Sequence, residues 1–308
     1  MPHHRYAFSP LFALAFVLVG TSGFKSETRP DQRNAILISW DGALREHVRS
    51  DLGRKELPHL ARLASEGALV DIDVTGHQTD TKSGHAQMLT GYDPKLTGVY
   101  SNGNFNPIPA GYSIFERLQQ AFGKKSMTTI MLTGKDHNLG SRGPSAGGHG
   151  EPYFLVRPNI TVWDGDQLRP ARTIAEKAIG YIDTYAGKGR FFLFIHFPDI
   201  DLGGHRYGEG SDDYQRALVE CDQLLGRILD ELKNKGVDDR TLVYVSADHG
   251  FDVGTTHHGN ATHIFLATND PKVARNGEQR DITPTILSAM GVTLSTITPP
   301  LPGKLLSK

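Results

Sequence analysis

The segment 35–39, with the sequence AILIS, is a continuous apolar run that is followed by Asp41-Gly42. A run this short and this apolar is typical of a strand that is covered on both faces, as in a parallel sheet. Comparable strand patterns follow at 68–74, 127–133, 191–197, 241–246 and 264–267. Helical patterns lie between or after them at 57–65, 113–122, 173–185, 211–232 and 281–290. This alternation predicts an α/β fold, a three-layer sandwich with a central, mostly parallel sheet and helices on both faces.

The only cysteine of the chain is Cys221, so no intramolecular disulfide can form. Cys221 shares one face of the helical pattern at 211–232 with apolar residues such as Leu218 and Leu225. Because a helical stripe of this kind packs on the core, we expect Cys221 to be a buried core residue rather than a catalytic thiol.

The N-terminal segment has the layout of a secretory signal peptide. A basic start at 3–5 precedes the apolar run 11–19, and small residues follow at 20–23. The run is too short to span a bilayer, and the alternative is a buried N-terminal helix. We predict a signal peptide at 1–23, a single domain at 24–308, a periplasmic or secreted location, and no membrane span in the mature chain.

The charge of the chain argues against a polyanionic ligand. Its 308 residues carry a formal net charge of -1, without a long basic or acidic run. A nucleic acid polymer is therefore not an expected partner. With 38% hydrophobic residues, the chain can bury a sizeable core.

Polar residues collect just past the predicted strands. They are Asp41, Lys135, Asp199, Asp201, Asp248 and His249. Because the carboxyl ends of parallel strands meet at one edge of the sheet, we expect these side chains to form a single polar site. The loop at 141–152 is rich in glycine, serine and proline, and it is the main candidate for contacts with a substrate.

Aspartate and histidine recur together in this set. The elements are DLGGH at 201–205 in a glycine-bearing loop, DH at 248–249 and HHG at 257–259, with Asp41 as a further carboxylate. Mixed carboxylate and imidazole ligands suit zinc, manganese or iron, whereas pure oxygen ligation suits calcium or magnesium. We predict two divalent metal ions, with zinc preferred over manganese. Two ions about 4 Å apart can activate a nucleophile and stabilise a leaving oxygen in phosphoryl transfer.

Thr81 stands directly before the helical segment that ends at Gly91. Threonine is a good helix N-cap, which is a purely structural role. The same position also suits a nucleophile, because a helix N-terminus favours anions and therefore an alkoxide or a phosphate.

The order of these motifs resembles the alkaline phosphatase superfamily, and in particular its type I phosphodiesterase/nucleotide pyrophosphatase branch. That branch carries T-F-P-N-H-x-x-L-V-T-G, whose first threonine is the nucleophile, and TKSGHAQMLTG aligns with it without a gap from Thr81 to Gly91. The branch places a phosphate-binding asparagine twenty-one residues further on, which gives Asn102. Its D-G, D-x-x-G-H, D-H-G and H-G motifs match at 41–42, 201–205, 248–250 and 258–259, and RDITPTIL at 280–287 resembles a helix of the superfamily.

The resemblance implies two metal sites. The ligands would be Asp201, His205 and His258 for one ion, and Asp41, Asp248 and His249 for the other, with Thr81 bridging to the second. His257 competes with His258, and we favour His258 because a glycine follows it.

The resemblance also implies covalent catalysis. Thr81 would attack phosphorus and form a phosphothreonine. Asn102 and the backbone of Thr81-Lys82 would hold the non-bridging oxygens. The chain departs from the branch at Lys82, where an aromatic residue normally helps to form a nucleotide-binding slot, so nucleotide specificity is not implied.

A second departure lies at Gly134-Lys135-Asp136-His137, which resembles the sulfatase G-K-x-H motif. It adds Lys135 and His137 to the catalytic candidates, and Lys82 and Lys135 to the substrate-binding ones. A cation such as Lys135 helps most with a dianionic monoester. Threonine at position 81 excludes the formylglycine chemistry of common sulfatases, which requires cysteine or serine.

The sequence therefore predicts an exported two-metal hydrolase of small-molecule phosphate esters, monoesters or diesters, acting through a phosphothreonine. One alternative is a sulfatase-like or phosphonate hydrolase without formylglycine. Another is a non-catalytic binding protein on the same fold, which the complete set of metal-ligand residues disfavours.

Overall fold

The computed structural model describes residues 1–3, 33–144, 148–165 and 167–307. Its strands are β1 Asn34–Trp40, β2 Ala68–Asp73, β3 Met127–Leu132, β4 Val162–Asp164, β5 Arg190–Phe197, β6 Thr241–Ser246, β7 His263–Thr268 and β8 Gly277–Glu278. Its α-helices are α1 Arg45–Arg54, α2 Pro58–Glu66, α3 Thr81–Thr90, α4 Pro94–Thr97, α5 Ile114–Phe122, α6 Ala171–Tyr185, α7 Asp199–Tyr207, α8 Asp212–Asn234 and α9 Ile282–Ala289. The predicted signal peptide lies, apart from residues 1–3, outside the described residues.

The eight strands form one sheet in the order β4-β3-β5-β1-β6-β7-β2-β8. Every neighbouring pair is parallel except those that involve β7, which runs antiparallel to β6 and to β2. The sheet is therefore mostly parallel, as the sequence predicted. The central strand β1 is buried at every position, which explains why its sequence is a continuous apolar run.

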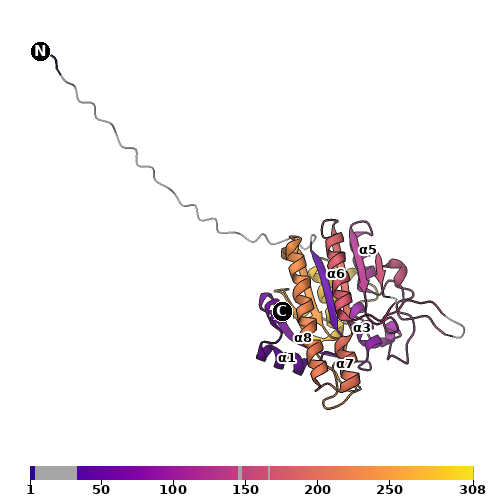
Figure 1. Cartoon of the computed structure of the whole chain (residues 1–308). Helices are drawn as coiled ribbons and strands as arrows, with labels where there is room; N and C mark the ends of the chain where they lie inside the picture. Colours follow the sequence, from indigo (N-terminus) through magenta and orange to yellow (C-terminus); the bar gives the residue numbers. More distant parts are fainter. Residues whose placement is uncertain (4–32, 145–147, 166, 308) are drawn as a thin grey trace.

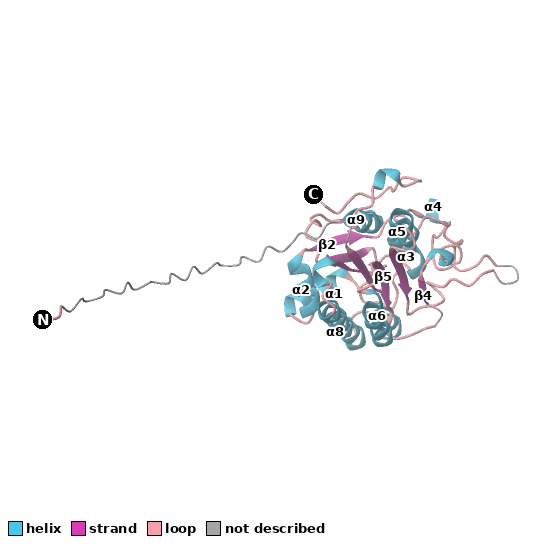
Figure 2. Cartoon of the chain, turned by 90° about the horizontal axis from the view of Figure 1, so that it is seen from above, coloured by secondary structure: helices cyan, strands magenta, loops and turns pink. Residues whose placement is uncertain are grey.

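Helices cover both faces of this sheet. Seen from above, α1, α2, α6 and α8 lie on one face and α3, α5 and α9 on the other (Figure 2). Helices α6 and α8 pack side by side in front of the sheet (Figure 1). The three-layer arrangement is confirmed. Cys221 is confirmed as a core residue, because it is fully buried on the inner face of α8.

Local signals define several helix ends. Helix α5 begins with a capping box, in which the Ser113 hydroxyl accepts a hydrogen bond from the backbone N–H of Glu116 and the Glu116 carboxylate accepts one from the backbone N–H of Ser113. Helix α8 is preceded by the N-cap residue Ser211, whose hydroxyl accepts a hydrogen bond from the backbone N–H of Tyr214. Helix α3 ends at Gly91, which adopts the left-handed conformation with φ of 72°.

Five elements were not predicted: the helices α1, α4 and α7 and the short strands β4 and β8. The segment 201–205 was expected to be a loop because it contains two glycines. It lies in helix α7 instead, and glycine is needed at position 204 because the buried ring of Phe251 lies against it, where an added Cβ would come within 2.5 Å of a ring carbon. Helix α1 has no apolar periodicity that would predict it, because charged residues dominate its sequence, REHVRSDLGR.

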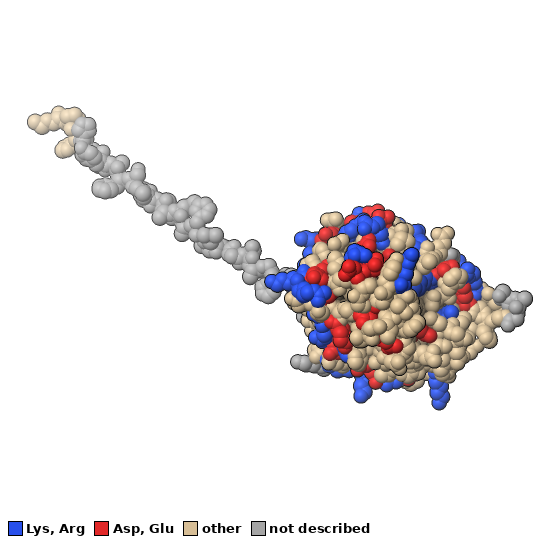
Figure 3. Space-filling model, turned by 60° about the horizontal axis from the view of Figure 1, so that its bottom comes forward, with Lys and Arg blue, Asp and Glu red and all other residues tan. Residues whose placement is uncertain are grey.

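Basic and acidic side chains are interspersed on the face that Figure 3 shows, without a broad field of one sign. This distribution agrees with the near-zero formal net charge of -1. None of the described helices is both long and apolar enough to cross a bilayer.

Candidate active site

The candidate site lies at the carboxyl edge of the three neighbouring strands β5, β1 and β6. Asp41 follows β1, Asp248 follows β6, and α7 with Asp201 follows β5. Lys135 reaches the same place from the end of β3. The sixth residue of the predicted set, Asp199, does not join them, because its carboxylate accepts the backbone N–H of Ala171 at the start of α6 at 2.6 Å.

One group of ligand-type side chains consists of Asp41, Asp248 and His249. One side-chain N or O atom of each lies within 4.8 Å of the others, and all three residues are buried. The Oδ1 atom of Asp248 accepts the backbone N–H of Gly42 at 3.1 Å. Within the described part of the chain, Asp41 Oδ1, Asp248 Oδ2 and His249 Nε2 are buried without a hydrogen-bond partner.

A second group consists of Asp201, His205 and His258, again with ligand atoms within 4.8 Å of one another. Asp201 Oδ1 lies 3.3 Å from His205 Nε2, and it too lacks a hydrogen-bond partner among the described residues. The Nε2 atoms of His205 and His258 lie 3.0 Å apart. The structure thus brings His258 to this group, whereas His257 lines a neighbouring recess.

The three imidazoles are oriented in the same way. His205 donates its Nδ1–H to the Thr256 carbonyl at 2.9 Å, and His249 donates to the Gly250 carbonyl at 2.9 Å. His258 donates to the Thr79 carbonyl at 2.6 Å. A backbone carbonyl can only accept, so each Nε2 atom is left with its lone pair, which is the form that binds a metal. Together with the unpartnered carboxylate oxygens, these atoms fit two divalent cations.

The electrostatics of the centre are dominated by burial and by Lys135. Burial acts to raise the pKa of Asp41, but Lys135, His196 and His249 outweigh it and hold this pKa well below its ordinary value. Burial and the neighbouring Asp41 charge raise the pKa of Asp248 well above its ordinary value. Burial opposes the charge of Lys135, but Asp41 and Asp201 raise its pKa above the ordinary value. Positive charge near this centre therefore favours the ionised form of its buried carboxylates.

Thr81 is the first residue of α3, and the N-cap position belongs to Asp80, so the prediction that Thr81 caps the helix was wrong by one residue. The carbonyl of Thr81 accepts the Nδ1–H of His85 at 2.8 Å, and the same nitrogen lies 3.3 Å from Asp248 Oδ2. Gly84 lies on the carbonyl of Asp248, where a Cβ would approach the oxygen to 2.4 Å. Two contacts thus hold the start of α3 against a metal-ligand candidate.

Asn102 is anchored beside Thr81. Its amide oxygen accepts the backbone N–H of Lys82 at 2.9 Å and the side-chain amide of Asn138 at 3.1 Å. Its own backbone N–H donates to Asp80 at 2.7 Å. The Lys82 N–H was expected to hold a non-bridging oxygen, but it is occupied by Asn102. The oriented NH2 group of Asn102 is instead the donor that this arrangement presents.

The side chain of Lys82 is also held in place. Its ammonium donates to the carbonyl of Asn102 at 3.0 Å and lies 4.2 Å from the centre of the Phe105 ring. Burial lowers the pKa of Lys82. The family's aromatic residue is absent at position 82, but Phe105 places a ring in contact with the lysine that replaces it.

His137 is not brought to the centre. Its side chain is 82% exposed, and its neighbours are Asp136 and Arg142. The prediction of a catalytic His137 therefore has no geometric support, because the turn after Lys135 directs this ring towards solvent. Lys135 itself is buried, but it contacts Asp41 and Asp201.

Several residues at the site were not identified from the sequence, and His196, Phe251 and Asp80 are among them. His196 lies inside β5 and donates to Asp41 Oδ2 at 2.9 Å, because its Nδ1 accepts the backbone N–H of Gly134. Phe251 packs edge-on against His205 and His258, with ring centres 5.4 Å away from each. Asp80 joins Asn102 to α3. Of these three, only Phe251 could have been suspected from the sequence, because it directly follows the DHG motif at 248–250.

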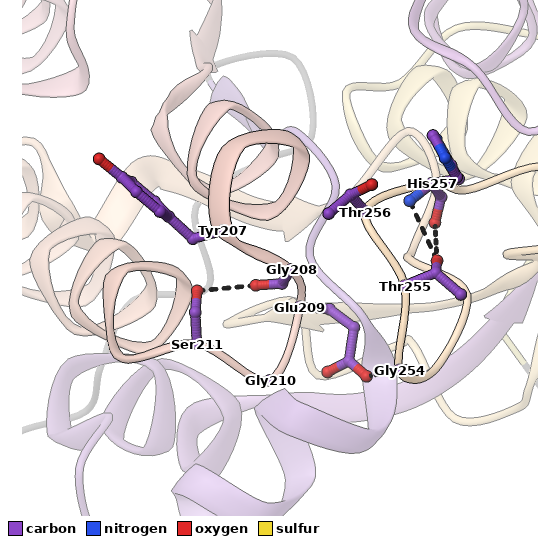
Figure 4. Close-up of a pocket in the computed structure, with 9 residues that line it drawn as sticks. All are labelled: Tyr207, Gly208, Glu209, Gly210, Ser211, Gly254, Thr255, Thr256 and His257. Carbon is purple, nitrogen blue, oxygen red and sulfur yellow. Dashed lines mark hydrogen bonds between the residues drawn. The ribbon is translucent and has the colours of Figure 1, made fainter.

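A recess of about 590 Å³ opens beside the second group. It lies between the end of α7 and the loop that leads to His258, and Figure 4 shows Glu209 and Ser211 on one side and Thr255, Thr256 and His257 on the other. Both walls belong to segments that carry a ligand candidate. The recess is a place into which part of a bound molecule can extend.

Comparisons with known proteins agree with this geometry. The family described as type I phosphodiesterase / nucleotide pyrophosphatase matches residues 35–279. The chain is 25% identical over 260 residues to an uncharacterized pyrophosphatase/phosphodiesterase of Schizosaccharomyces pombe, which covers 77% of this chain and 48% of that protein. It is 25% identical over 220 residues to a bis(5'-adenosyl)-triphosphatase of Mus musculus, covering 70% of this chain and 46% of that protein. The chain spans about half the length of the curated relatives it matches.

Solved structures share the fold at low sequence identity. A phosphonate monoester hydrolase from Silicibacter pomeroyi superimposes with a TM-score of 0.61 at 16% identity, over 89% of this chain and 76% of that one. The alkaline phosphatase of the Antarctic bacterium TAB5 gives 0.60 at 15% identity, over 85% of this chain and 99% of that one.

Proposed function

Because the chain belongs to the type I phosphodiesterase / nucleotide pyrophosphatase family, we propose that it is a metal-dependent hydrolase of phosphate esters with Thr81 as its nucleophile. One observation carries the proposal. Two groups of aspartate and histidine side chains, the first buried and the second open to solvent at His205, place their ligand atoms in one centre, and the start of α3 is packed against that centre. One oxygen of each aspartate and the Nε2 atom of His249 are buried there without a hydrogen-bond partner among the described residues. A hydroxyl at a helix N-terminus beside two cation sites suits attack on phosphorus.

We infer the roles of the residues from their contacts. Asp41, Asp248 and His249 would hold one divalent ion and Asp201, His205 and His258 the other; zinc is preferred and manganese is the second choice for this ligand set. When bound, such ions supply the Lewis-acid charge that makes a threonine alkoxide and a leaving oxygen accessible. Thr81 Oγ loses its proton and forms a bond to phosphorus, and the bond from phosphorus to the ester oxygen breaks. The leaving group takes up a proton as an alcohol.

The second half of the reaction restores the enzyme. Water attacks the phosphothreonine, the bond between phosphorus and Thr81 Oγ breaks, and phosphate or a phosphate monoester is released. The NH2 group of Asn102, fixed by Lys82 and Asn138, donates to a non-bridging oxygen in both steps. His85 holds the carbonyl of Thr81 and so keeps the first turn of α3 in place.

The proposed substrate is a small molecule with a phosphate mono- or diester, and the recess beside His258 would accept part of it. The relatives' names include pyrophosphatase, phosphodiesterase and bis(5'-adenosyl)-triphosphatase, so a phosphoanhydride also belongs among the candidates. Export through the signal peptide at 1–23 is part of the proposal, and it would place the reaction in the periplasm or outside the cell.

The test is a parallel assay of p-nitrophenyl phosphate, bis-p-nitrophenyl phosphate, p-nitrophenyl sulfate and a p-nitrophenyl phosphonate, after dialysis against zinc or manganese. The proposal expects turnover of a phosphate ester that depends on the metal. Thr81→Ala should abolish turnover and keep the metal content, and Thr81→Ser should retain part of the activity. Full activity of Thr81→Ala would exclude the nucleophile, and turnover of the sulfate or phosphonate alone would favour the alternative hydrolases.

A further inference from the structure

Lys135 lies between the two ligand groups rather than beside a phosphate position. Its ammonium is 2.7 Å from Asp41 Oδ2, which belongs to the first group, and it contacts Asp201 Oδ2, which belongs to the second. The side chain is only 10% exposed. One lysine therefore joins a carboxylate of each predicted metal site.

In Asp41 and in Asp201, the two carboxylate oxygens have different surroundings. In each, Oδ2 contacts the lysine, whereas Oδ1 is buried and has no hydrogen-bond partner among the described residues. Lys135 thus leaves free the oxygen of each aspartate that lies beside the imidazoles, at 3.4 Å from His249 Nε2 for Asp41 and at 3.3 Å from His205 Nε2 for Asp201. The ammonium does not block the ligand atoms, but its positive charge would repel cations bound to the same two aspartates.

The charge of the centre makes this lysine important. Three aspartates, Asp41, Asp201 and Asp248, are buried within one centre. In the part of the chain that the structure describes, the ion-pair partners of these carboxylates are Lys135 and several histidines. Lys135 is the one ammonium group among them, and a lysine ammonium is ordinarily cationic at neutral pH. A buried carboxylate without a counter-ion is strongly unfavourable.

We propose that Lys135 is an internal counter-ion of the metal centre, which stabilises the fold while the sites are free of metal and weakens metal binding once the ions supply the charge. This inference rests on the proposed function in so far as the two groups are metal sites. It differs from the expectation that Lys135 binds a substrate oxygen, because it assigns the lysine an effect that needs no substrate.

A thermodynamic cycle gives the sign of the effect. Removing the ammonium destabilises the metal-free fold more than the metal-loaded fold, because the bound ions replace its charge in the second case only. The difference between these two losses of folding free energy must equal the gain in metal-binding free energy of the folded variant, because both routes round the cycle have the same total free energy. The variant therefore binds metal more tightly. A lysine that merely positions the carboxylates predicts the opposite, which is weaker binding.

The experiment compares the wild-type protein with Lys135→Met, Lys135→Arg and Lys177→Met. Lys177 is the control, because its ammonium pairs with Asp164 at 2.8 Å and the described contacts of this pair include none of the ligand candidates. Each protein is stripped with a chelator, its melting temperature is measured by circular dichroism, and zinc is then added under competition with a chromogenic chelator. No substrate is present.

We expect metal-free Lys135→Met to melt roughly 5–10 °C below the wild type, as for the loss of one partner of a buried ion pair. Saturating zinc should close more than half of that gap, and zinc should bind Lys135→Met about tenfold more tightly at each of the two sites, which corresponds to about 1.4 kcal/mol per ion. Lys135→Arg should stay near the wild type. The deficit of Lys177→Met, if any, should be the same with and without zinc.

Several results would overturn the inference. They are an unchanged melting temperature of metal-free Lys135→Met, a deficit that zinc leaves intact, or weaker zinc binding. A variant that folds only with zinc is the extreme form of the expected result, whereas one that fails to fold even with zinc contradicts it. A wild-type protein that binds no zinc and no manganese refutes the proposed function instead, so the two failures can be told apart.

Discussion

The close contact between α3 and Asp248 makes Gly84 a sensitive probe of the proposed nucleophile. Replacing it with alanine adds a Cβ that would lie 2.4 Å from the carbonyl oxygen of Asp248 and 2.9 Å from its carbonyl carbon. Ordinary contact begins at 3.4 Å, so the helix or the Asp248 backbone must move by about 1 Å. Both are backbone segments tied into secondary structure, and neither can yield by a change of rotamer.

Two effects of Gly84→Ala on stability oppose each other. Alanine is a better helix former than glycine by about 1 kcal/mol. Overpacking of a close-packed interior costs about 1–3 kcal/mol, and contact with rigid backbone belongs at the upper end of this range. We therefore expect a net destabilisation of about 1–2 kcal/mol, which lowers the melting temperature by roughly 2–8 °C. A displacement of about 1 Å at the nucleophile should lower kcat by about 10²-fold with little change of KM.

The matched control is Gly180→Ala in α6. No described atom lies within 4 Å of the added Cβ there, so only the helix preference remains and the melting temperature should rise. The measurements are thermal unfolding of both metal-loaded variants and steady-state kinetics on the phosphate ester that the wild type hydrolyses. Wild-type stability together with wild-type kcat for Gly84→Ala would refute the packing of α3 on Asp248.

Three further outcomes are expected. His258→Ala should lose about one metal ion per chain by atomic absorption and His257→Ala none, and equal losses would contradict the assignment of His258. Phe251→Ala should destabilise the fold by about 3–5 kcal/mol in denaturant unfolding, because its ring is buried beneath His205 and His258; a loss below 1 kcal/mol would show that the ring does not support them. Burial raises the pKa of the Cys221 thiol, so a thiol reagent should label the native protein far more slowly than the unfolded one; equally fast labelling would show that Cys221 is accessible.

Much of the layer structure could be predicted because six of the eight strands and most of the helices have a local pattern. The apolar run that became β1 is buried at every position, and a parallel strand between two helical layers needs no polar face. Helix α7 was missed because two glycines in one short segment are typical of a loop. The contact between Gly204 and the ring of Phe251 becomes visible only in the tertiary structure. Long-range packing overrode the local preference there.

The candidate site was only partly accessible to the same reasoning. Motif order supplied the two sets of aspartate and histidine residues, and the structure brings each set together. His137 and Asp199 also follow predicted strands, but the chain turns the first to solvent and uses the second to hold the start of α6. Position after a strand places a residue at the correct edge of the sheet, but it does not give the direction of its side chain.

The sequence by itself determined the α/β class, the family resemblance and the residue types of both ligand groups, because periodicity and motif spacing are local properties of the chain. Only the tertiary structure brought His258 rather than His257 to the second group, oriented Asn102 through Lys82 and Asn138, and placed Lys135 between Asp41 and Asp201. Those choices depend on atoms from strands and loops far apart along the chain. Their distances are set by how the elements pack, and no local pattern encodes them.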